Sequence, residues 1–176
     1  MVDVLPEYLG TAAATAVPSL IPERMRPAGL LAALRTALAR WRLSVLRPAA
    51  AVDQNTFAVT RATATRYHLR TLSYLARVAP RLVLGGPSEC PRRRLCMIGL
   101  RRQYGIHFHG FKAFDDAAQR QTALTEGVID VEVTFSTDGR LATGTLVPLR
   151  DDKRLQPHEA VVPVVSDRVI ARYGAR

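Results

Sequence analysis

Short apolar segments alternate with helix-like segments through the middle of the 176-residue chain. RLVLGG (81–86) and VIDVEVTF (128–135) have the composition of buried strands, whereas TLSYLARVA (71–79) and DDAAQRQTALTEG (115–127) have the pattern of helices. The acidic start and glycine end of the last segment are typical of helix termini. Such alternation favours strands joined by helical crossovers. The sequence therefore predicts an α/β fold with a largely parallel sheet.

The amino-terminal part of the chain has a second helical pattern. In ERMRPAGLLAALRTALARW (23–41), leucines and Trp41 recur at steps of three and four residues, which predicts an amphipathic helix. The short runs LSVL (43–46) and TFAVT (56–60) are β-like. Both ends of the chain are abrupt, so we expect its first and last elements to have few partners.

The chain is strongly basic, with 25 Lys and Arg against 15 Asp and Glu and a formal net charge of +10. A positive charge favours anionic partners such as nucleic acid or acidic lipid. The arginines are nevertheless scattered, and 92–94 is their one dense cluster. We interpret them as solvated surface residues. No apolar run reaches the ~18 residues of a membrane span, and no signal peptide is visible at the start.

Motifs for enzymatic chemistry are absent from the sequence. LGGPSEC (84–90) follows a predicted strand but has neither the dinucleotide-binding glycine spacing nor the lysine of a P-loop. His107 and His109 would lie on one face of a predicted strand, where they are either a metal-ligating pair or half-exposed strand histidines. The second interpretation is favoured because no third ligand is evident. The sequence predicts no enzyme activity, metal or cofactor.

Two cysteines, Cys90 and Cys96, lie close together in ECPRRRLC (89–96). They are too few to form a structural zinc site by themselves. A short local disulfide and two free thiols both remain open. A disulfide would imply an oxidising, extracytoplasmic compartment.

Several motifs occur in the order found in one family of transport proteins. They are PEYLGT (6–11), DQNTFAVT (53–60), the helix–strand–loop–helix segment 71–105, GVIDVEVTFSTDGRL (127–141) and the carboxy-terminal segment 146–174. Together they closely resemble the substrate-binding proteins of ABC importers for the osmoprotectants glycine betaine, choline and carnitine, of the ProX-like or OpuAC type. The resemblance runs from about residue 3 to the end of the chain.

The resemblance implies a bilobal, type II periplasmic-binding-protein-like α/β fold with one lobe complete and the other partial. Residues 1–52 would form part of lobe 1, residues 53–145 lobe 2 with the hinge strands, and residues 146–176 the return to lobe 1. Family members carry a substantial segment before the PEYLGT motif. We therefore expect this chain to be truncated at its amino terminus.

The resemblance also implies a ligand site in an interlobe cleft, where aromatic faces hold a quaternary ammonium group by cation–π attraction. A positive or hydrogen-bonding group holds the carboxylate of a betaine. The expected ligand-binding residues are Tyr8, Thr11, Asn55, Phe57, Arg93, Phe135 and Glu159.

Each of these residues matches a role in the family. Tyr8, Phe57 and Phe135 match cage aromatics, whereas Thr11 and Arg93 match contacts to the carboxylate. Asn55 matches a polar neighbour. Glu159 falls near a position that is tyrosine in many members. It would attract a cation and repel a betaine carboxylate, which would favour a choline-like ligand or weaken the site.

The predicted function is therefore binding of a quaternary-ammonium solute and delivery to an ABC importer permease in the membrane. The family implies an extracytoplasmic location, periplasmic or lipid-anchored, for a protein that is not itself transmembrane. No nucleic-acid partner is expected under this interpretation. The alternative is a truncated or degenerate basic module that has lost solute binding and contacts anionic partners such as nucleic acid.

Overall fold

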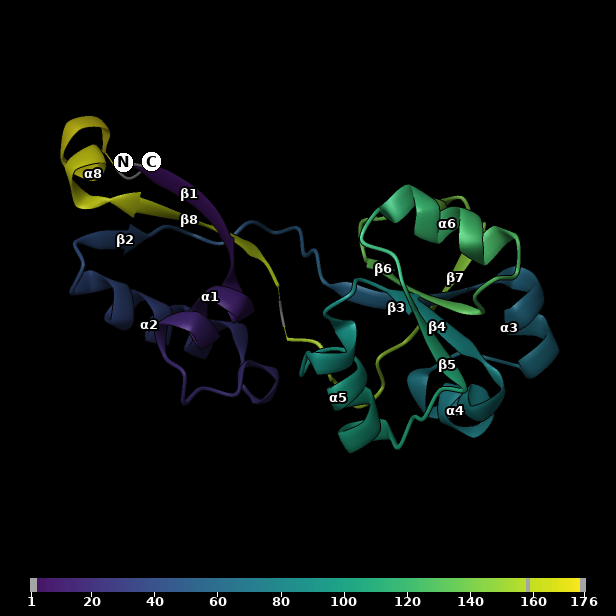
Figure 1. Ribbon diagram of the computed structural model, residues 1–176. Coiled ribbons are helices and arrows are strands. Elements are labelled where there is room, and N and C mark those ends of the chain that lie inside the picture. The colour runs from purple at the N-terminus through teal and green to yellow at the C-terminus, as the bar shows by residue number, and fades with distance from the viewer. Residues whose placement is uncertain (1–2, 158, 175–176) are drawn as a thin grey trace. The chain divides into compact units, whose positions relative to one another are not determined.

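The computed structural model describes residues 3–157 and 159–174. The chain forms two compact units, each with its own sheet (Figure 1). Unit 1 comprises Met1–Gln54 and Pro157–Arg176, and unit 2 comprises Asn55–Gln156. Both units combine strands with helices, which confirms the predicted α/β class.

Unit 1 is built on a three-stranded antiparallel sheet in the order β1-β8-β2. Its strands are β1 (Val4–Tyr8), β8 (Val161–Ser166) and β2 (Leu43–Val45). The helices α1 (Leu9–Ala16) and α2 (Pro27–Ala39) lie on one side of this sheet, with the short η1 (Pro22–Arg24) between them in sequence. The last helix is α8 (Asp167–Tyr173), which follows β8 directly.

The helix α2 follows the predicted amphipathic pattern over most of its length. Its proline at the first turn supplies a fixed φ angle where no intrahelical N–H bond is needed. Leu30, Leu34 and Leu38 are buried against the rest of unit 1. Trp41 was expected on the same apolar stripe, but it is exposed. The helix ends at Ala39, so Trp41 leaves the helical periodicity, and the Arg40 guanidinium lies 4.4 Å from its ring centroid.

Unit 2 contains a five-stranded sheet in the order β5-β4-β6-β3-β7. Its strands are β3 (Asn55–Thr60), β4 (Val83–Gly86), β5 (Gly110–Ala113), β6 (Val131–Phe135) and β7 (Leu146–Leu149). The strand β4 pairs in parallel with β5 and β6, whereas β3 runs antiparallel to β6 and β7. The sheet is therefore mixed, and because the sheet of unit 1 is antiparallel, the expectation of a largely parallel sheet is wrong for both units.

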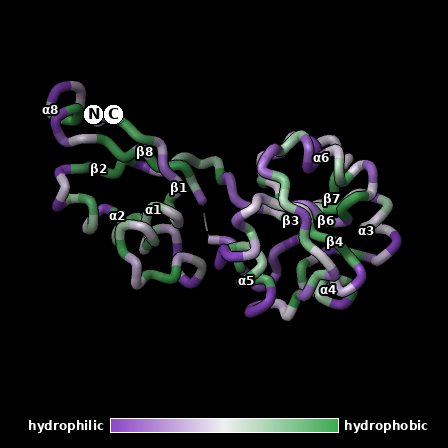
Figure 2. The backbone as a smooth tube through the Cα atoms, viewed as in Figure 1, coloured by the Kyte–Doolittle hydropathy of each residue, from purple (hydrophilic) through white to green (hydrophobic). Residues whose placement is uncertain are grey.

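Hydrophobic layers cover both faces of this sheet. On β3, Phe57 and Val59 point into one core and Ala58 points into another, as the two-residue period of a strand requires. The first core is packed with α4 (Leu72–Val78) and the α5 (Met97–Gly99) to η4 (Leu100–Tyr104) segment, and the second with α6 (Ala117–Thr125). Hydrophobic residues run along the strands of both sheets (Figure 2).

The remaining helical elements of unit 2 are short. They are α3 (Arg61–Tyr67), η2 (Ala79–Arg81), η3 (Cys90–Arg92) and α7 (Gly139–Ala142). Across the residues with described positions, no helix is long and apolar enough to cross a membrane.

The boundary between the units differs from the expected one. Residues 146–156 were assigned to the return segment of lobe 1, but β7 pairs with β3 along its length and belongs to unit 2. The Asp151 carboxylate also accepts hydrogen bonds from the backbone N–H groups of Leu155 (2.9 Å) and Gln156 (2.7 Å) and from the Tyr104 hydroxyl. These contacts hold the segment after β7 in unit 2, so the return to unit 1 begins at Pro157.

A charged cluster lies on the same face of the five-stranded sheet as the second core, where Glu132 is paired opposite Ala58. The Glu132 side chain on β6 is fully buried, and its Oε1 lies 2.6 Å from Nη2 of Arg140. Arg140 also pairs with Asp138 at 2.6 Å, and Asp138 accepts a hydrogen bond of 2.6 Å from the Thr134 hydroxyl. The cluster joins the end of β6 to α7, the short helix that begins after the turn following Phe135.

Candidate functional site

The end of β1 places Tyr8 on the surface of unit 1. Tyr8 is the last residue of β1 and directly precedes α1, and its side chain is 38% exposed. Its hydroxyl donates a hydrogen bond of 2.7 Å to Oδ2 of Asp53. The bond fixes the ring beside a carboxylate that comes from the connection after β2. An exposed aromatic face next to a negative charge is a favourable surface for an organic cation.

The start of α1 binds the carboxylate of Glu159. Glu159 Oε2 accepts hydrogen bonds from the backbone N–H groups of Gly10 (2.8 Å) and Thr11 (3.3 Å), and Oε1 accepts one of 2.8 Å from the Thr11 hydroxyl. The first N–H groups of a helix have no partner inside the helix, and they carry partial positive charge. Among the described residues no side chain at the start of α1 provides an N-cap, so Glu159 satisfies these donors.

Backbone pairing holds Glu159 in this position. The Asp53 N–H donates to the Glu159 carbonyl at 3.0 Å, and the Leu9 N–H donates to the Ala160 carbonyl at 3.0 Å. Glu159 and Ala160 therefore lie between the start of α1 and Asp53. Tyr8, Gly10, Thr11, Asp53 and Glu159 are brought together here, and we call them the unit 1 cluster.

The two carboxylates of the unit 1 cluster act on the Tyr8 hydroxyl. The hydrogen bond to Asp53, together with partial desolvation and the negative charges of Asp53 and Glu159, raises the pKa of Tyr8 above its usual range. The electrostatic potential around this ring is therefore negative. A cation is attracted to such a surface, and a further carboxylate is repelled.

Three of the expected unit 2 residues lie on one face of the five-stranded sheet. Asn55 on β3 is paired opposite Phe135 on β6, and Phe57 is paired opposite Val133. Because side chains alternate between faces, Asn55, Phe57 and Phe135 point to the same side. Phe135 is 49% exposed, whereas Phe57 is 1% exposed. Phe57 is a core residue here, so the structure brings Asn55 and Phe135 together at the sheet end but offers no Phe57 ring face to a solute.

The fourth expected unit 2 residue, Arg93, lies in a loop closed by a disulfide. The bond joins Cys90 and Cys96, whose Cα atoms are 5.3 Å apart, and both cysteines are buried in the core that contains Phe57. The Arg93 guanidinium is about half exposed and pairs with the carboxylate of Glu89 at 3.2 Å. The disulfide anchors the loop in the core and leaves its arginines at the surface.

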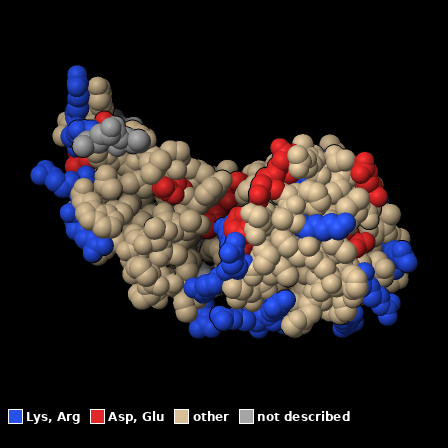
Figure 3. Space-filling model, viewed as in Figure 1, with Lys and Arg blue, Asp and Glu red and all other residues tan. Residues whose placement is uncertain are grey.

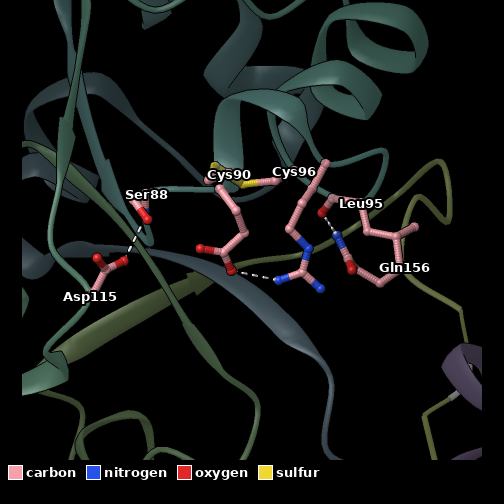
Figure 4. The surroundings of a disulfide bond; sticks show 8 residues. Ser88, Cys90, Leu95, Cys96, Asp115 and Gln156 are labelled. Carbon is pink, nitrogen blue, oxygen red and sulfur yellow. Dashed lines mark hydrogen bonds and ion pairs between the residues drawn. A yellow bond between two sulfur atoms is a disulfide. The ribbon is translucent and has the colours of Figure 1, made fainter.

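Two hydrogen bonds attach the flanks of the disulfide loop to the rest of unit 2 (Figure 4). The Ser88 N–H donates to Asp115 at 2.8 Å, and the Gln156 side-chain amide donates to the Leu95 carbonyl at 2.9 Å. The backbone hydrogen bond from Ser88 is the largest cause that lowers the pKa of Asp115. The loop is therefore held on both sides.

His107 and His109 do not lie in a strand as expected. Both are exposed and precede β5, and the His109 N–H donates to the carbonyls of Ala79 (3.1 Å) and Leu82 (3.0 Å). In the part of the chain that the structure describes, no group of three or more His, Cys, Asp or Glu side chains is placed to hold a metal ion.

Sequence reasoning did not single out three residues that matter at these positions. Asp53 and Gly10 were present in the DQNTFAVT and PEYLGT motifs, but no pattern showed that they would meet Tyr8 and Glu159. Gly10 is needed because a Cβ atom there would lie 3.0 Å from Pro157 Cβ and 3.1 Å from Glu159 Oε2. Glu89 precedes Arg93 by four residues, a spacing typical of an ion pair, and this signal was available.

Comparison with known proteins agrees with the motifs. The model of the family described as the substrate binding domain of ABC-type glycine betaine transport systems (OpuAC) matches residues 1–175. The carnitine transport binding protein OpuCC of Listeria monocytogenes is 27% identical over 130 residues, which are 66% of this chain and 38% of that protein. The chain thus spans well under half the length of this curated relative.

Solved structures of binding proteins are also similar to this chain. A crystal structure described as a glycine betaine/carnitine/choline ABC transporter has a TM-score of 0.78 and 26% identity, over 97% of this chain and 62% of that one. The apo structure of YehZ from Escherichia coli has a TM-score of 0.69 and 24% identity, over 98% and 65%, and shares the fold. The similarity covers both units, and the predicted type II binding-protein fold is confirmed. This chain belongs to the family of substrate-binding domains of ABC-type glycine betaine transport systems.

Proposed function

We propose that this chain binds a small solute with a quaternary ammonium group, such as choline or glycine betaine, for delivery to the permease of an ABC importer. The proposed ligand contacts are Tyr8 with its neighbouring carboxylates, together with Phe135, Asn55 and Arg93. The observation that carries the proposal is the exposed Tyr8 ring held by Asp53 at 2.7 Å, with the Glu159 carboxylate in the same cluster.

The physical reason lies in the chemistry of a quaternary ammonium ion. It has no N–H group, so it cannot be recognised by hydrogen-bond acceptors alone. Aromatic faces and nearby negative charges attract it, and each desolvated ring contributes about 0.5–2 kcal/mol. The Tyr8 cluster offers both kinds of attraction. Phe57 is left out of the proposal because its ring is buried.

An extracytoplasmic location belongs to the same proposal. Disulfides persist in oxidising compartments, and the Cys90–Cys96 bond closes the loop that carries Arg93. The basic surface does not point to another function. Lys and Arg side chains occur at several separate places on the visible face (Figure 3), and several arginines stack on aromatic rings of the chain itself, as Arg66 does on Tyr67 and Arg172 on Tyr173.

Calorimetric titration with choline and glycine betaine tests the proposal. The neutral alcohol 3,3-dimethyl-1-butanol, in which carbon replaces the nitrogen of choline, is the matched control ligand. We expect heat of binding from at least one of the two ammonium solutes and none from the alcohol. At a concentration of 100 times Kd, the bound solute should raise the free energy of unfolding by about 2.7 kcal/mol.

Variants of Tyr8 link binding to the site. Tyr8→Phe keeps the aromatic face and should retain most of the affinity, whereas Tyr8→Leu should weaken it about tenfold because a cation–π contact is lost. Tyr173→Leu removes an exposed ring from α8 and serves as the control. No binding of either ammonium solute at millimolar concentration, or equal loss in Tyr8→Leu and Tyr173→Leu, would contradict the proposal.

A further inference from the structure

The unit 1 cluster already contains a bound carboxylate, that of Glu159. Both of its oxygens are engaged by the start of α1, through two backbone N–H groups and the Thr11 hydroxyl. The side chain is 7% exposed. Glu159 is separated from Thr11 by 148 residues in the sequence, so the contact is made by the fold of unit 1 and not by a local turn.

The donors that Glu159 uses are those that a solute carboxylate would need. Backbone N–H groups at a helix start and a hydroxyl beside them form a common anion-binding arrangement. For a solute carboxylate to take this place, Glu159 would have to leave its three donors. A nearly buried carboxylate that loses its hydrogen bonds is strongly destabilised. The exchange is therefore unfavourable.

The negative charge around Tyr8 also disfavours a solute carboxylate. Asp53 is hydrogen-bonded to the Tyr8 hydroxyl, and Glu159 lies close enough to contribute to the raised pKa of that hydroxyl. A solute that rests its ammonium group on the Tyr8 ring would gain from both carboxylates. A carboxylate on the same solute would meet two like charges, and like charges brought together at a binding site are costly.

We infer that Glu159 is a built-in carboxylate that makes unit 1 select quaternary-ammonium solutes without a carboxylate, the choline class, over the betaine class. The inference rests on the proposed function and specifies its substrate class. Glu159 acts in two ways: it occupies the hydrogen-bond donors of α1, and it keeps a negative charge beside the aromatic ring.

The test compares the affinities of choline and glycine betaine for the chain and for two variants. For the unchanged chain we expect choline to bind at least about tenfold more tightly than glycine betaine, since one decade corresponds to only about 1.4 kcal/mol. In Glu159→Gln the ratio should move toward glycine betaine by about tenfold, because the negative charge beside Tyr8 is gone and the neutral amide binds the donors of α1 less strongly than a carboxylate does.

Glu7→Gln is the matched control variant. Glu7 lies on β1 in the same unit, opposite Val162, and its replacement removes the same formal charge without removing a hydrogen bond from the start of α1. The choline-to-betaine ratio should stay as in the unchanged chain. An equal shift in both variants would show that only net charge matters, and it would overturn the role of Glu159.

A second measurement does not depend on the folding of a variant. In nuclear magnetic resonance spectra of the unchanged chain, the amide signals of Gly10 and Thr11 should stay in place with saturating choline, because Glu159 keeps its hydrogen bonds. Large shifts of both signals with glycine betaine, together with affinity equal to or above that of choline, would overturn the inference and leave the proposed function standing. If neither solute binds, the proposed function itself fails.

Discussion

Replacing Arg140 by leucine should destabilise unit 2, because the buried Glu132 carboxylate would lose its cation. Glu132 is fully buried, and its Oε1 lies 2.6 Å from the Arg140 guanidinium. Among the residues that the structure describes, Glu132 Oε2 finds no hydrogen-bond partner. Removing one partner of a buried ion pair costs about 3–5 kcal/mol. Arg140 is 23% exposed, so water screens part of the pair and we expect about 3 kcal/mol.

Urea unfolding followed by circular dichroism measures this loss. The double variant Glu132→Leu/Arg140→Leu is the control, because replacing both partners by apolar residues avoids the unpaired charge. We expect the double variant to be more stable than Arg140→Leu alone. The fluorescence of Trp41, the single tryptophan of the sequence, reports on unit 1 separately.

The pH dependence of the stability loss in Arg140→Leu tests the same ion pair a second time. Burial raises the pKa of Glu132, whereas Arg140 lowers it, so the pKa should rise further in Arg140→Leu. A carboxyl whose pKa is raised on folding contributes stability below its unfolded pKa of about 4.3, and this contribution is lost as the pH rises through the folded value. The variant should therefore regain stability as the pH falls from 7 toward 5.

The contribution of Asp138 to the pH dependence of stability has the opposite sign and falls at lower pH. Its hydrogen bond with Arg140 holds the pKa of Asp138 well below its usual range. The stability from Asp138 is present above its unfolded pKa of about 3.9 and is lost as the pH falls through the lower folded value. It therefore changes little between pH 7 and 5. Wild-type stability in Arg140→Leu, or a defect that grows over this interval, would refute the reasoning.

Other substitutions test the packing of the candidate site, each by urea unfolding. Phe57→Ala should cost about 3–5 kcal/mol because the ring is in the core, whereas Phe135→Ala, at an exposed ring, should cost under about 1 kcal/mol; similar losses would contradict the assignment. Gly10→Ala should cost about 1 kcal/mol because its Cβ would lie 3.0 Å from Pro157. Gly139→Ala, with no atom within 4 Å of the added carbon, should stay within about 0.5 kcal/mol of wild type. Equal losses of stability in Gly10→Ala and Gly139→Ala would contradict the close contact between position 10 and Pro157. Reducing the disulfide, whose cysteines are six positions apart, should cost about 2 kcal/mol by loop entropy, and an unchanged midpoint would count against this.

The elements of the fold were more predictable from the sequence than their arrangement. The helix over 115–127 was expected from its acidic start and glycine end, and α6 forms there with Asp116 as its cap. The direction of β3 was not predictable, because an alternating apolar pattern is the same in parallel and antiparallel strands. β3 enters unit 2 between β6 and β7, and pairing with these strands sets its direction.

The candidate site was predictable only as a set of positions. The motifs identified Tyr8, Thr11 and Glu159, and the structure brings all three into one cluster. No local pattern showed that Glu159 would bind the start of α1, because this contact depends on the return of the chain after unit 2. Phe57 was expected in an aromatic cage from its motif, but its buried position depends on the packing of the disulfide loop and the segment after β7.

The start of α1 and the Arg93 guanidinium, two of the groups that could bind a solute carboxylate, differ in how firmly they are occupied. Glu159 is nearly buried and holds three donors of α1, whereas the Arg93–Glu89 pair is about half exposed. Exposed ion pairs contribute little to stability, about 0–1 kcal/mol. Of these two, we therefore propose the Arg93 guanidinium as the group that exchanges its partner for a solute carboxylate.

Arg93→Ala should accordingly weaken glycine betaine and leave choline unaffected, because only the betaine has a carboxylate. A hydrogen bond to a charged group contributes about 1.5–3 kcal/mol, which corresponds to a loss of at least about tenfold in affinity. Arg92→Ala, in the same exposed loop, is the control, and calorimetric titration is the measurement. Equal losses for the two solutes would show that Arg93 contributes only general charge or loop structure, and equal losses in the two variants would remove its special role.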